Sequence, residues 1–213
     1  MITAYFLLAW FGVVLALSLI GVFDVPTRPP LAILFTVVTP VFLYAIDRRL
    51  LHGRLFEGIC KLDNHALVVV QTDRVVGAAF LIEFAKGNLP SGFALPAGIG
   101  DVLIGVAAPW VAYTLTMRKP QAVQIARWWN YLGILDLVVA VTMGITHSGS
   151  SLGIFAQEIS MRPIGQYPLC LIPTWAVPLA IILHLRSLEL LRQPQSQTEL
   201  GEPPTQKLSE QLG

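Results

Sequence analysis

Long apolar runs alternate with short polar segments along most of this 213-residue chain. A helix needs about 20 predominantly apolar residues to cross the hydrocarbon layer of a membrane. Six segments reach or approach this length, and they cover residues 3–23, 31–46, 66–84, 93–115, 127–145 and 168–185. The second is the shortest and contains Pro40, which a membrane helix tolerates better than a soluble helix does. The pattern predicts an all-α fold: a polytopic transmembrane bundle of six spans.

The remaining segments are more polar and predict no second folded domain. We expect one six-span transmembrane domain over residues 1–191. Residues 147–167 are too polar to span, and they form either an external loop or a re-entrant segment. Residues 192–213 are rich in Gln, Pro and Glu and have little apolar surface to bury, so we expect a disordered cytoplasmic tail.

Composition supports a membrane as the solvent of this chain. The sequence is 54% hydrophobic and 13% charged, whereas an average soluble chain carries about 25% charged residues. The net charge is +1, and no basic cluster is rich enough to bind nucleic acid. Cys60 and Cys170 are too few and too far apart in sequence for a disulfide framework or a thiolate metal site.

Lysine and arginine are concentrated in the segments that follow the second, fourth and sixth apolar runs. Loops on the cytoplasmic side of a membrane carry the excess of these residues. We therefore expect these segments in the cytoplasm, with the amino end outside and the carboxyl end cytoplasmic. The chain is expected to be a multi-pass membrane protein, alone or as a homo-oligomer.

Ionisable residues inside the predicted spans form the first candidate for a functional site. Arg74 and Asp73 lie in the third span, Asp101 in the fourth and Asp136 in the fifth. A charged side chain at the centre of a membrane costs at least about 2.5–3.5 kcal/mol, so such residues normally face other helices and find partners. Counted along the helices, Arg74 and Asp136 lie at one level and Asp101 about one turn above. We expect a buried polar cluster in which Arg74 bridges the carboxylates.

Three carboxylates against one arginine leave an excess of negative charge, which favours a bound proton or small cation. The leading hypothesis is a small transporter or channel-like protein coupled to that ion, with Asp101 as the carboxylate that changes protonation. The alternative is a structural or accessory protein whose buried charges only hold helices together.

Other residues in the spans have simpler interpretations. His184 lies near the cytoplasmic end of the last span and is expected to extend towards the interface, as Arg186 does. Trp110, Trp128 and Trp129 lie near span ends and are expected to be interfacial anchors. A further pair, Pro173 and Pro178, predicts a kink in the last span.

No cofactor is implied by the sequence. Haem held across helices would need histidines facing one another at matching depth, and only His184 lies within a predicted span. No residues have the spacing of a metal site.

The sequence GIGD at residues 98–101 resembles the Gly-x-Gly-Asp motif of intramembrane aspartyl proteases. In that family, glycines such as Gly98 and Gly100 would give a substrate access to the backbone, and two aspartates share a proton. The family has its other aspartate on an earlier helix, after a tyrosine, and a Pro-Ala-Leu element after the motif. In this chain Asp136 comes later, Asp73 has no preceding tyrosine, and ALP comes before the motif. An enzyme of this kind is therefore the third hypothesis.

A longer resemblance covers about residues 73–185. DRVVGAAFL, ALPAGIGDVLIG, WNYLGILDLVVAV and PLCLIPTWAVPLAIILHL are similar to a group of bacterial multi-pass membrane proteins without an assigned function. The resemblance implies a shared helical bundle and an inner-membrane location. It implies no activity.

Overall fold

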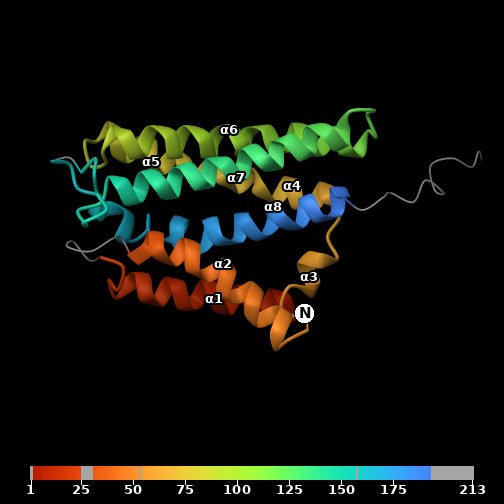
Figure 1. The fold of residues 1–213 in the computed structure, drawn as a ribbon, viewed down its shortest axis with the longest axis horizontal. Coiled ribbons are helices and arrows are strands. Elements are labelled where there is room, and N and C mark those ends of the chain that lie inside the picture. The colour runs from red at the N-terminus through yellow and green to blue at the C-terminus, as the bar shows by residue number, and fades with distance from the viewer. Residues whose placement is uncertain (1, 25–30, 53, 157, 193–213) are drawn as a thin grey trace, which may run out of the picture.

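The computed structural model describes residues 2–24, 31–52, 54–156 and 158–192 (Figure 1). All the regular secondary structure of these residues is helical, as the apolar pattern predicted. In chain order the helices are α1 (Ile2–Leu19), α2 (Leu31–Arg49), α3 (Glu57–Cys60), α4 (Asn64–Val70), η1 (Gln71–Gly77), α5 (Ala78–Ala85), α6 (Ser91–Thr116), α7 (Ala122–Thr146), η2 (Arg162–Gly165), η3 (Ile172–Ala176) and α8 (Val177–Arg192). The predicted disordered tail lies outside the described residues apart from Arg192.

Among the described residues, four helical segments are long and apolar enough to cross a membrane. They are Ile2–Leu19, Ser91–Thr116, Ala122–Thr146 and Ile172–Arg192. The second predicted span forms α2, whose apolar part, Ala32–Asp47, is shorter than these four. The third predicted span is helical throughout but is divided into α4, η1 and α5.

The division of the third segment occurs where polar residues interrupt its apolar run. Asp63 caps the start of α4 by accepting a hydrogen bond from the backbone N–H of Ala66 at 2.8 Å. From Gln71 to Gly77 the chain tightens into a 3₁₀ helix, which has three residues per turn. Residues three apart therefore share one side, and the buried residues of η1 are Gln71, Arg74 and Gly77.

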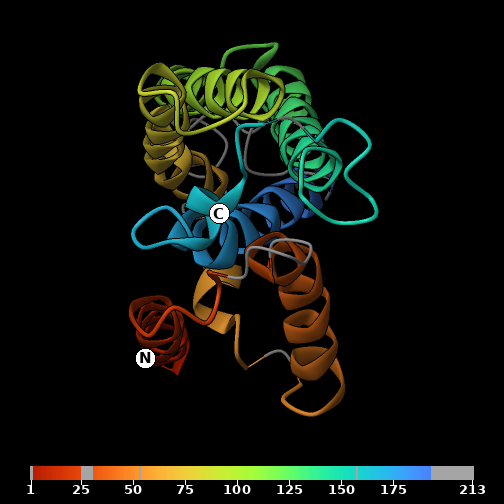
Figure 2. The same cartoon turned by 90° about the vertical axis from the view of Figure 1, so that its left-hand side faces the viewer.

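The helices lie roughly along one long axis, and the chain runs back and forth between its two ends (Figure 1). Four helices form what we call the four-helix group: α4–η1–α5 taken as one helix, α6, α7 and α8. Within this group, α6 packs on both η1 and α7. Seen from one end, α8 lies between the other helices of this group and the pair α1 and α2 (Figure 2). α2 packs on α8 and η3, and α1 packs mainly on α3 and η3.

The start of α1 and the end of α8 lie at the same end of the bundle, beside α3 (Figure 1). Thr3 Oγ1 accepts a hydrogen bond from the backbone N–H of Gly58 at 2.7 Å, which places the start of α1 against α3. Arg186 Nη2 donates to Cys60 O at 2.9 Å, which places α8 there as well. The start of α1 and the end of α8 therefore lie at one end of the bundle, whereas the sequence analysis expected the two ends of the chain on opposite sides of the membrane.

The two prolines of the last apolar segment shape its first turns. Pro173 lies in η3, a π-helical turn, and Pro178 is the second residue of α8. The carbonyl of Pro173 accepts a hydrogen bond from the Thr36 hydroxyl of α2. This carbonyl therefore joins α2 to the rest of the bundle.

Candidate functional site

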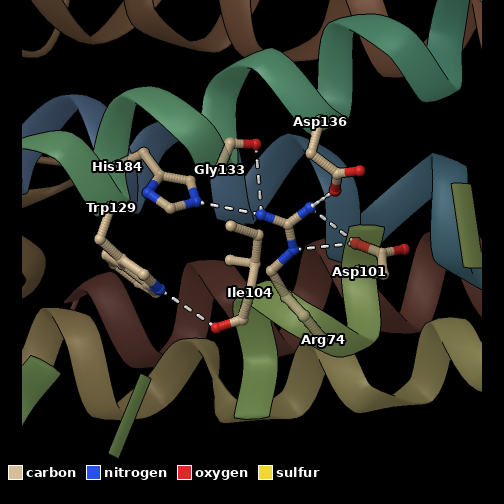
Figure 3. Close-up of polar contacts among 7 residues, drawn as sticks. All are labelled: Arg74, Asp101, Ile104, Trp129, Gly133, Asp136 and His184. Atoms are coloured by element: carbon tan, nitrogen blue, oxygen red, sulfur yellow. Dashed lines mark hydrogen bonds and ion pairs between the residues drawn. The ribbon is translucent and has the colours of Figure 1, made fainter. Parts of the chain in front are cut away.

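Arg74 lies buried at the centre of the four-helix group, between side chains of α6, α7 and α8 (Figure 3). Its Nε and Nη2 atoms donate to Asp101 Oδ1 at 2.9 and 2.7 Å, and Nη2 also donates to Asp136 Oδ2. Its Nη1 atom donates to Gly133 O at 3.3 Å and to His184 Nε2 at 3.2 Å. A guanidinium has five N–H groups and no acceptor. Every N–H of Arg74 therefore has an acceptor.

The charges of this cluster do not balance. Asp101 and Asp136 share the single guanidinium of Arg74, and no other Lys or Arg of the described residues pairs with either carboxylate. The two carboxylates are not equally held, because Asp101 accepts two N–H groups and Asp136 accepts one. Asp136 Oδ1 accepts no hydrogen bond from the described residues and lies over Gly100.

Glycines let the helices approach closely enough to form the cluster. A Cβ atom on Gly77 would overlap the Asp101 side chain, and one on Gly100 would overlap Asp136 Oδ1. A Cβ atom on Gly98 would lie 2.7 Å from Leu81 Cδ2 and 3.2 Å from Gly77 O. The expectation that Gly98 and Gly100 give access to the backbone is therefore corrected. Leu81 and Asp136 already occupy the space beside these two glycines.

His184 is fully buried and belongs to the cluster, which corrects the expectation that it extends towards the interface. Asn130 determines its tautomer. Asn130 Nδ2 donates to Ala126 O and to Ser187 Oγ, both at 2.8 Å, so its Oδ1 faces His184 Nδ1, also at 2.8 Å. The reverse amide orientation would place two acceptors, Asn130 Oδ1 and Ala126 O, against each other. His184 therefore carries its proton on Nδ1 and accepts from Arg74 at Nε2.

A hydrogen-bonded chain continues from His184 to the end of the bundle at which α4 begins. Ser187 Oγ accepts from Asn130 and donates to Asn64 Oδ1 at 2.7 Å. Asn130 and Ser187 are fully buried, whereas Asn64 is half-buried at the start of α4. Each donor in this chain points away from Arg74 and towards Asn64.

Trp129 supports the ring of His184 and is not an interfacial anchor. It is buried, its Nε1 donates to Ile104 O at 3.2 Å, and its ring centroid lies 5.0 Å from that of His184 (Figure 3). Trp110 and Trp128 are exposed on the outside of the bundle. The three tryptophans thus have different environments, although all three lie near the ends of the predicted spans.

A family model matches residues 30–192, and its description is a domain of unknown function, DUF8737. The chain belongs to this family. The DUF8737 region contains every residue of the cluster and the helices from α2 to α8, whereas α1 precedes it. Curated proteins and solved structures give no match to the chain.

Within the DUF8737 region, the structure leaves Asp73 outside the cluster. Asp73 lies on the exposed side of η1, and the buried side carries Gln71, Arg74 and Gly77. The expectation that Asp73 contributes a third buried carboxylate is therefore corrected. Adjacent residues of a 3₁₀ helix point about 120° apart, so Asp73 and Arg74 cannot share a face.

Gln71 is a residue of the DUF8737 region that the sequence analysis did not single out. It is almost completely buried, and both polar atoms of its side-chain amide lack a hydrogen-bond partner. It lies one 3₁₀ turn before Arg74, on the same buried side and towards the Asn64 end.

The sequence contains a weak signal for the other missed residues. His184 and Ser187 are three residues apart on α8, and Asn130 and Gly133 are three apart on α7, so each pair shares a helix face. Polar side chains such as His184, Ser187 and Asn130 within apolar helices normally face the protein interior. Among the described residues, no group of three or more His, Cys, Asp or Glu side chains could hold a metal ion.

Proposed function

We propose that this protein is a small transporter or channel-like protein of the bacterial cytoplasmic membrane that binds and moves a proton or a small cation at the cluster of Arg74, Asp101 and Asp136. In this proposal α2 and α4–η1–α5 also cross the membrane, which makes six passes. The end that carries α3 is cytoplasmic, because most lysines and arginines outside the helices' apolar parts lie there.

The observation that carries the proposal is the excess negative charge of the cluster. The two buried carboxylates carry two negative charges when ionised, and the single guanidinium neutralises one of them. One negative charge is left without a partner. An uncompensated charge inside a membrane is costly, and a proton or a cation on the less strongly held carboxylate removes that cost. We assign this role to Asp136 and not to Asp101, which was expected from the sequence, because Asp136 accepts one N–H where Asp101 accepts two.

The saturation of Arg74 argues against an anion as the ligand. All five N–H groups of the guanidinium already have acceptors in the protein, so an anion would have to displace a carboxylate, the Gly133 carbonyl or His184. A cation needs no such displacement, because Asp136 Oδ1 accepts no hydrogen bond from the described residues. The Arg74 guanidinium also lies between the two carboxylates, so a proton on Asp136 would not be shared with Asp101 in the way that the two aspartates of an aspartyl protease share one.

Ion flux into liposomes tests the proposal. Purified protein is reconstituted, a membrane potential is imposed, and internal fluorescent indicators report entry of protons or of Na⁺. We expect flux with the wild type, loss of flux with Asp136→Asn, and unchanged flux with Asp73→Asn. The last variant is the matched control, because Asp73 lies on the same segment as Arg74 but on its exposed side. Flux that survives in Asp136→Asn would overturn the proposal.

The second candidate function is a structural or accessory protein whose buried charges only hold helices together. The complete set of acceptors around Arg74 also favours this candidate. Arg74 joins η1 to α6, α7 and α8 through its five hydrogen bonds, which is what a purely structural residue would do. If the charges only hold helices together, neither pH nor cations should change the stability of the wild type relative to Asp136→Asn. A ligand that binds only the folded state raises its melting temperature. Melting curves in detergent from pH 5 to pH 8, with and without Na⁺, K⁺ and Li⁺, separate the two candidates.

A further inference from the structure

The two halves of the four-helix group differ in what fills them. From Arg74 towards the start of α4, a row of buried polar side chains lies between α4, α7 and α8, beside an apolar cluster that includes Val68, Ala108 and Leu191. From Arg74 towards the start of α6, aliphatic and aromatic side chains fill the space between α5, α6 and α7. This asymmetry bears on the route by which an ion reaches the cluster.

The polar half contains a continuous path of hydrogen bonds. It runs from Arg74 to His184 at 3.2 Å, to Asn130 at 2.8 Å, to Ser187 at 2.8 Å, and to Asn64 at 2.7 Å. The four contacts join residues of η1, α8, α7 and α4, so the path lies between helices. Its last member is half-buried, so the path begins at the surface of the bundle.

Gln71 provides an independent indication that this half accepts a polar ligand. Its side chain is 1% exposed, and neither its amide nitrogen nor its amide oxygen has a partner. Leaving a buried polar group unpaired costs about 1–3 kcal/mol, so such a group in a folded protein needs an explanation. Water that moves along this half would supply both a donor and an acceptor to Gln71, and a cation would bind its amide oxygen.

The opposite half is closed by apolar packing. Phe80 and Phe93 meet edge to face with their ring centroids 5.3 Å apart, and Ala94 and Ala97 of α6 are fully buried beside them. Along α6, the buried apolar residues Phe93, Ala94 and Ala97 separate Gly92, which lies against the buried His147 side chain, from Asp101. An ion would have to shed its hydration there without any replacement ligand, which is unfavourable.

We propose that the ion and its water reach Asp136 from the end at which α4 begins, along the path Asn64, Ser187, Asn130, His184 and Gln71, while the half around Phe80 and Phe93 stays closed. This route rests on the proposed function for its cargo. The side chains of the path are buried, so passage requires their hydrogen bonds to be exchanged for bonds to water. With the α3 end in the cytoplasm, as in the proposed function, this route connects the cluster to the inside of the cell and not to the outside.

Silver-ion accessibility of introduced cysteines tests the route. Ag⁺ is close in size to a transported alkali cation, and it replaces the proton of a thiol to form a sulfur–silver bond. Cys60 and Cys170 are replaced by serine, and single cysteines are then introduced as Gln71→Cys and Ser187→Cys on the path. Ala97→Cys in the closed half is the matched control, because Ala97 and Ser187 are equally buried.

The measurement is protection from a maleimide. Reconstituted protein is exposed to Ag⁺, excess silver is removed, the protein is unfolded, and maleimide incorporation is read by intact mass. A parallel sample that retains Cys60, which is exposed on α3, reports which end of the bundle faces the added silver. Melting temperatures and gel filtration establish that each variant is folded, and Ser187→Cys replaces only an oxygen by a sulfur.

We expect silver added at the α3 end to protect Gln71→Cys and Ser187→Cys completely and Ala97→Cys not at all. Unprotected Gln71→Cys and Ser187→Cys in vesicles whose Cys60 reacts would overturn the route, as would equal protection of Ala97→Cys. Different measurements test the route and the proposed function, so the failure of one can be distinguished from the failure of the other. Asp136→Asn added to Gln71→Cys abolishes flux if the function is correct, whereas silver reaction at Gln71→Cys reports the route whether or not flux occurs.

Discussion

At the residue scale, one arginine determines how the centre of the bundle is built. Arg74 uses every N–H it has, and its acceptors come from α6, α7 and α8. Removing one member of a buried ion pair leaves a charge without compensation, which typically costs about 3–5 kcal/mol. The cluster is therefore the place where single substitutions should have their largest effects on folding.

Arg74→Ala should lower the free energy of unfolding by about 3–5 kcal/mol, because it leaves two buried carboxylates without a positive partner. We expect this loss to be larger than that from substitution of any other charged residue. The double variant Arg74→Ala with Asp136→Ala should recover part of this loss, since it removes one of them. Chemical denaturation in detergent measures both. A double variant that is no more stable than Arg74→Ala would contradict the pairing of Arg74 with Asp136.

Glycine substitutions provide a second test with opposite signs at two sites. A Cβ atom on Gly133 would overlap the His184 ring, and overpacking a tight contact costs about 1–3 kcal/mol. Gly12 has nothing within 4 Å of the Cβ position, and alanine is favoured over glycine in a helix by about 0.5–1 kcal/mol. Melting curves should show a loss for Gly133→Ala and a small gain for Gly12→Ala. A gain at both sites would mean that His184 does not lie against Gly133.

At the scale of elements, η1 explains which side chains reach the centre. It has seven residues, although 3₁₀ helices rarely exceed three or four. Its threefold repeat places Gln71, Arg74 and Gly77 in one row, and Gly77 lets Asp101 approach Arg74. On a regular α-helix the same three residues would drift by about 60° per step. The 3₁₀ segment therefore brings all three to the same buried side of η1.

An ion pair connects the segment that follows α1 to the start of η2. Arg162 Nε and Nη2 donate to the two carboxylate oxygens of Asp24 at 2.7 and 3.0 Å, and Gln166 donates to the same group at 3.1 Å. The hydrogen bonds from Arg162, and then that from Gln166, lower the pKa of Asp24 below its ordinary value. A carboxyl with a lowered pKa in the folded state stabilises the protein above its ordinary pKa and loses this effect as pH falls through the lowered value.

We therefore expect Asp24→Asn to lower the melting temperature slightly at pH 7, and the difference from wild type to disappear in strong acid or high salt. The effect is small because the pair is largely exposed and screened by solvent. Melting curves from pH 2 to pH 7 provide the measurement. A difference that persists below the range in which Asp24 is ionised would show that the asparagine acts by another route.

At the scale of the whole molecule, the start of α1, the end of α8 and α3 share one end of the bundle. Reporter fusions placed before Thr3, after Lys119 and after Arg192 should all read cytoplasmic. Fusions at Gly87 and Ser150 should read external, because these positions lie at the opposite end, where the basic residues are fewer. Opposite readings before Thr3 and after Arg192 would contradict the arrangement of the helices.

The apolar pattern along the chain was sufficient to predict the helical class and the long helices. The predicted spans 93–115 and 127–145 correspond to α6 and α7, because apolar residues in such number can satisfy their backbone polar groups in a membrane only as helices. It also pointed to Arg74, Asp101 and Asp136 as one group, because charges at such depth must find partners.

Tertiary structure alone decided which face each polar residue presents and what it meets there. Asp73 points outward because η1 is a 3₁₀ helix, and His184 turns inward because Gly133 leaves room for its ring and Asn130 bonds to it. Gly98 and Gly100 are filled by side chains of neighbouring elements, not open to a substrate. Periodicity and span length describe one segment at a time, whereas these outcomes depend on how closely two segments approach, which packing between distant parts of the chain determines.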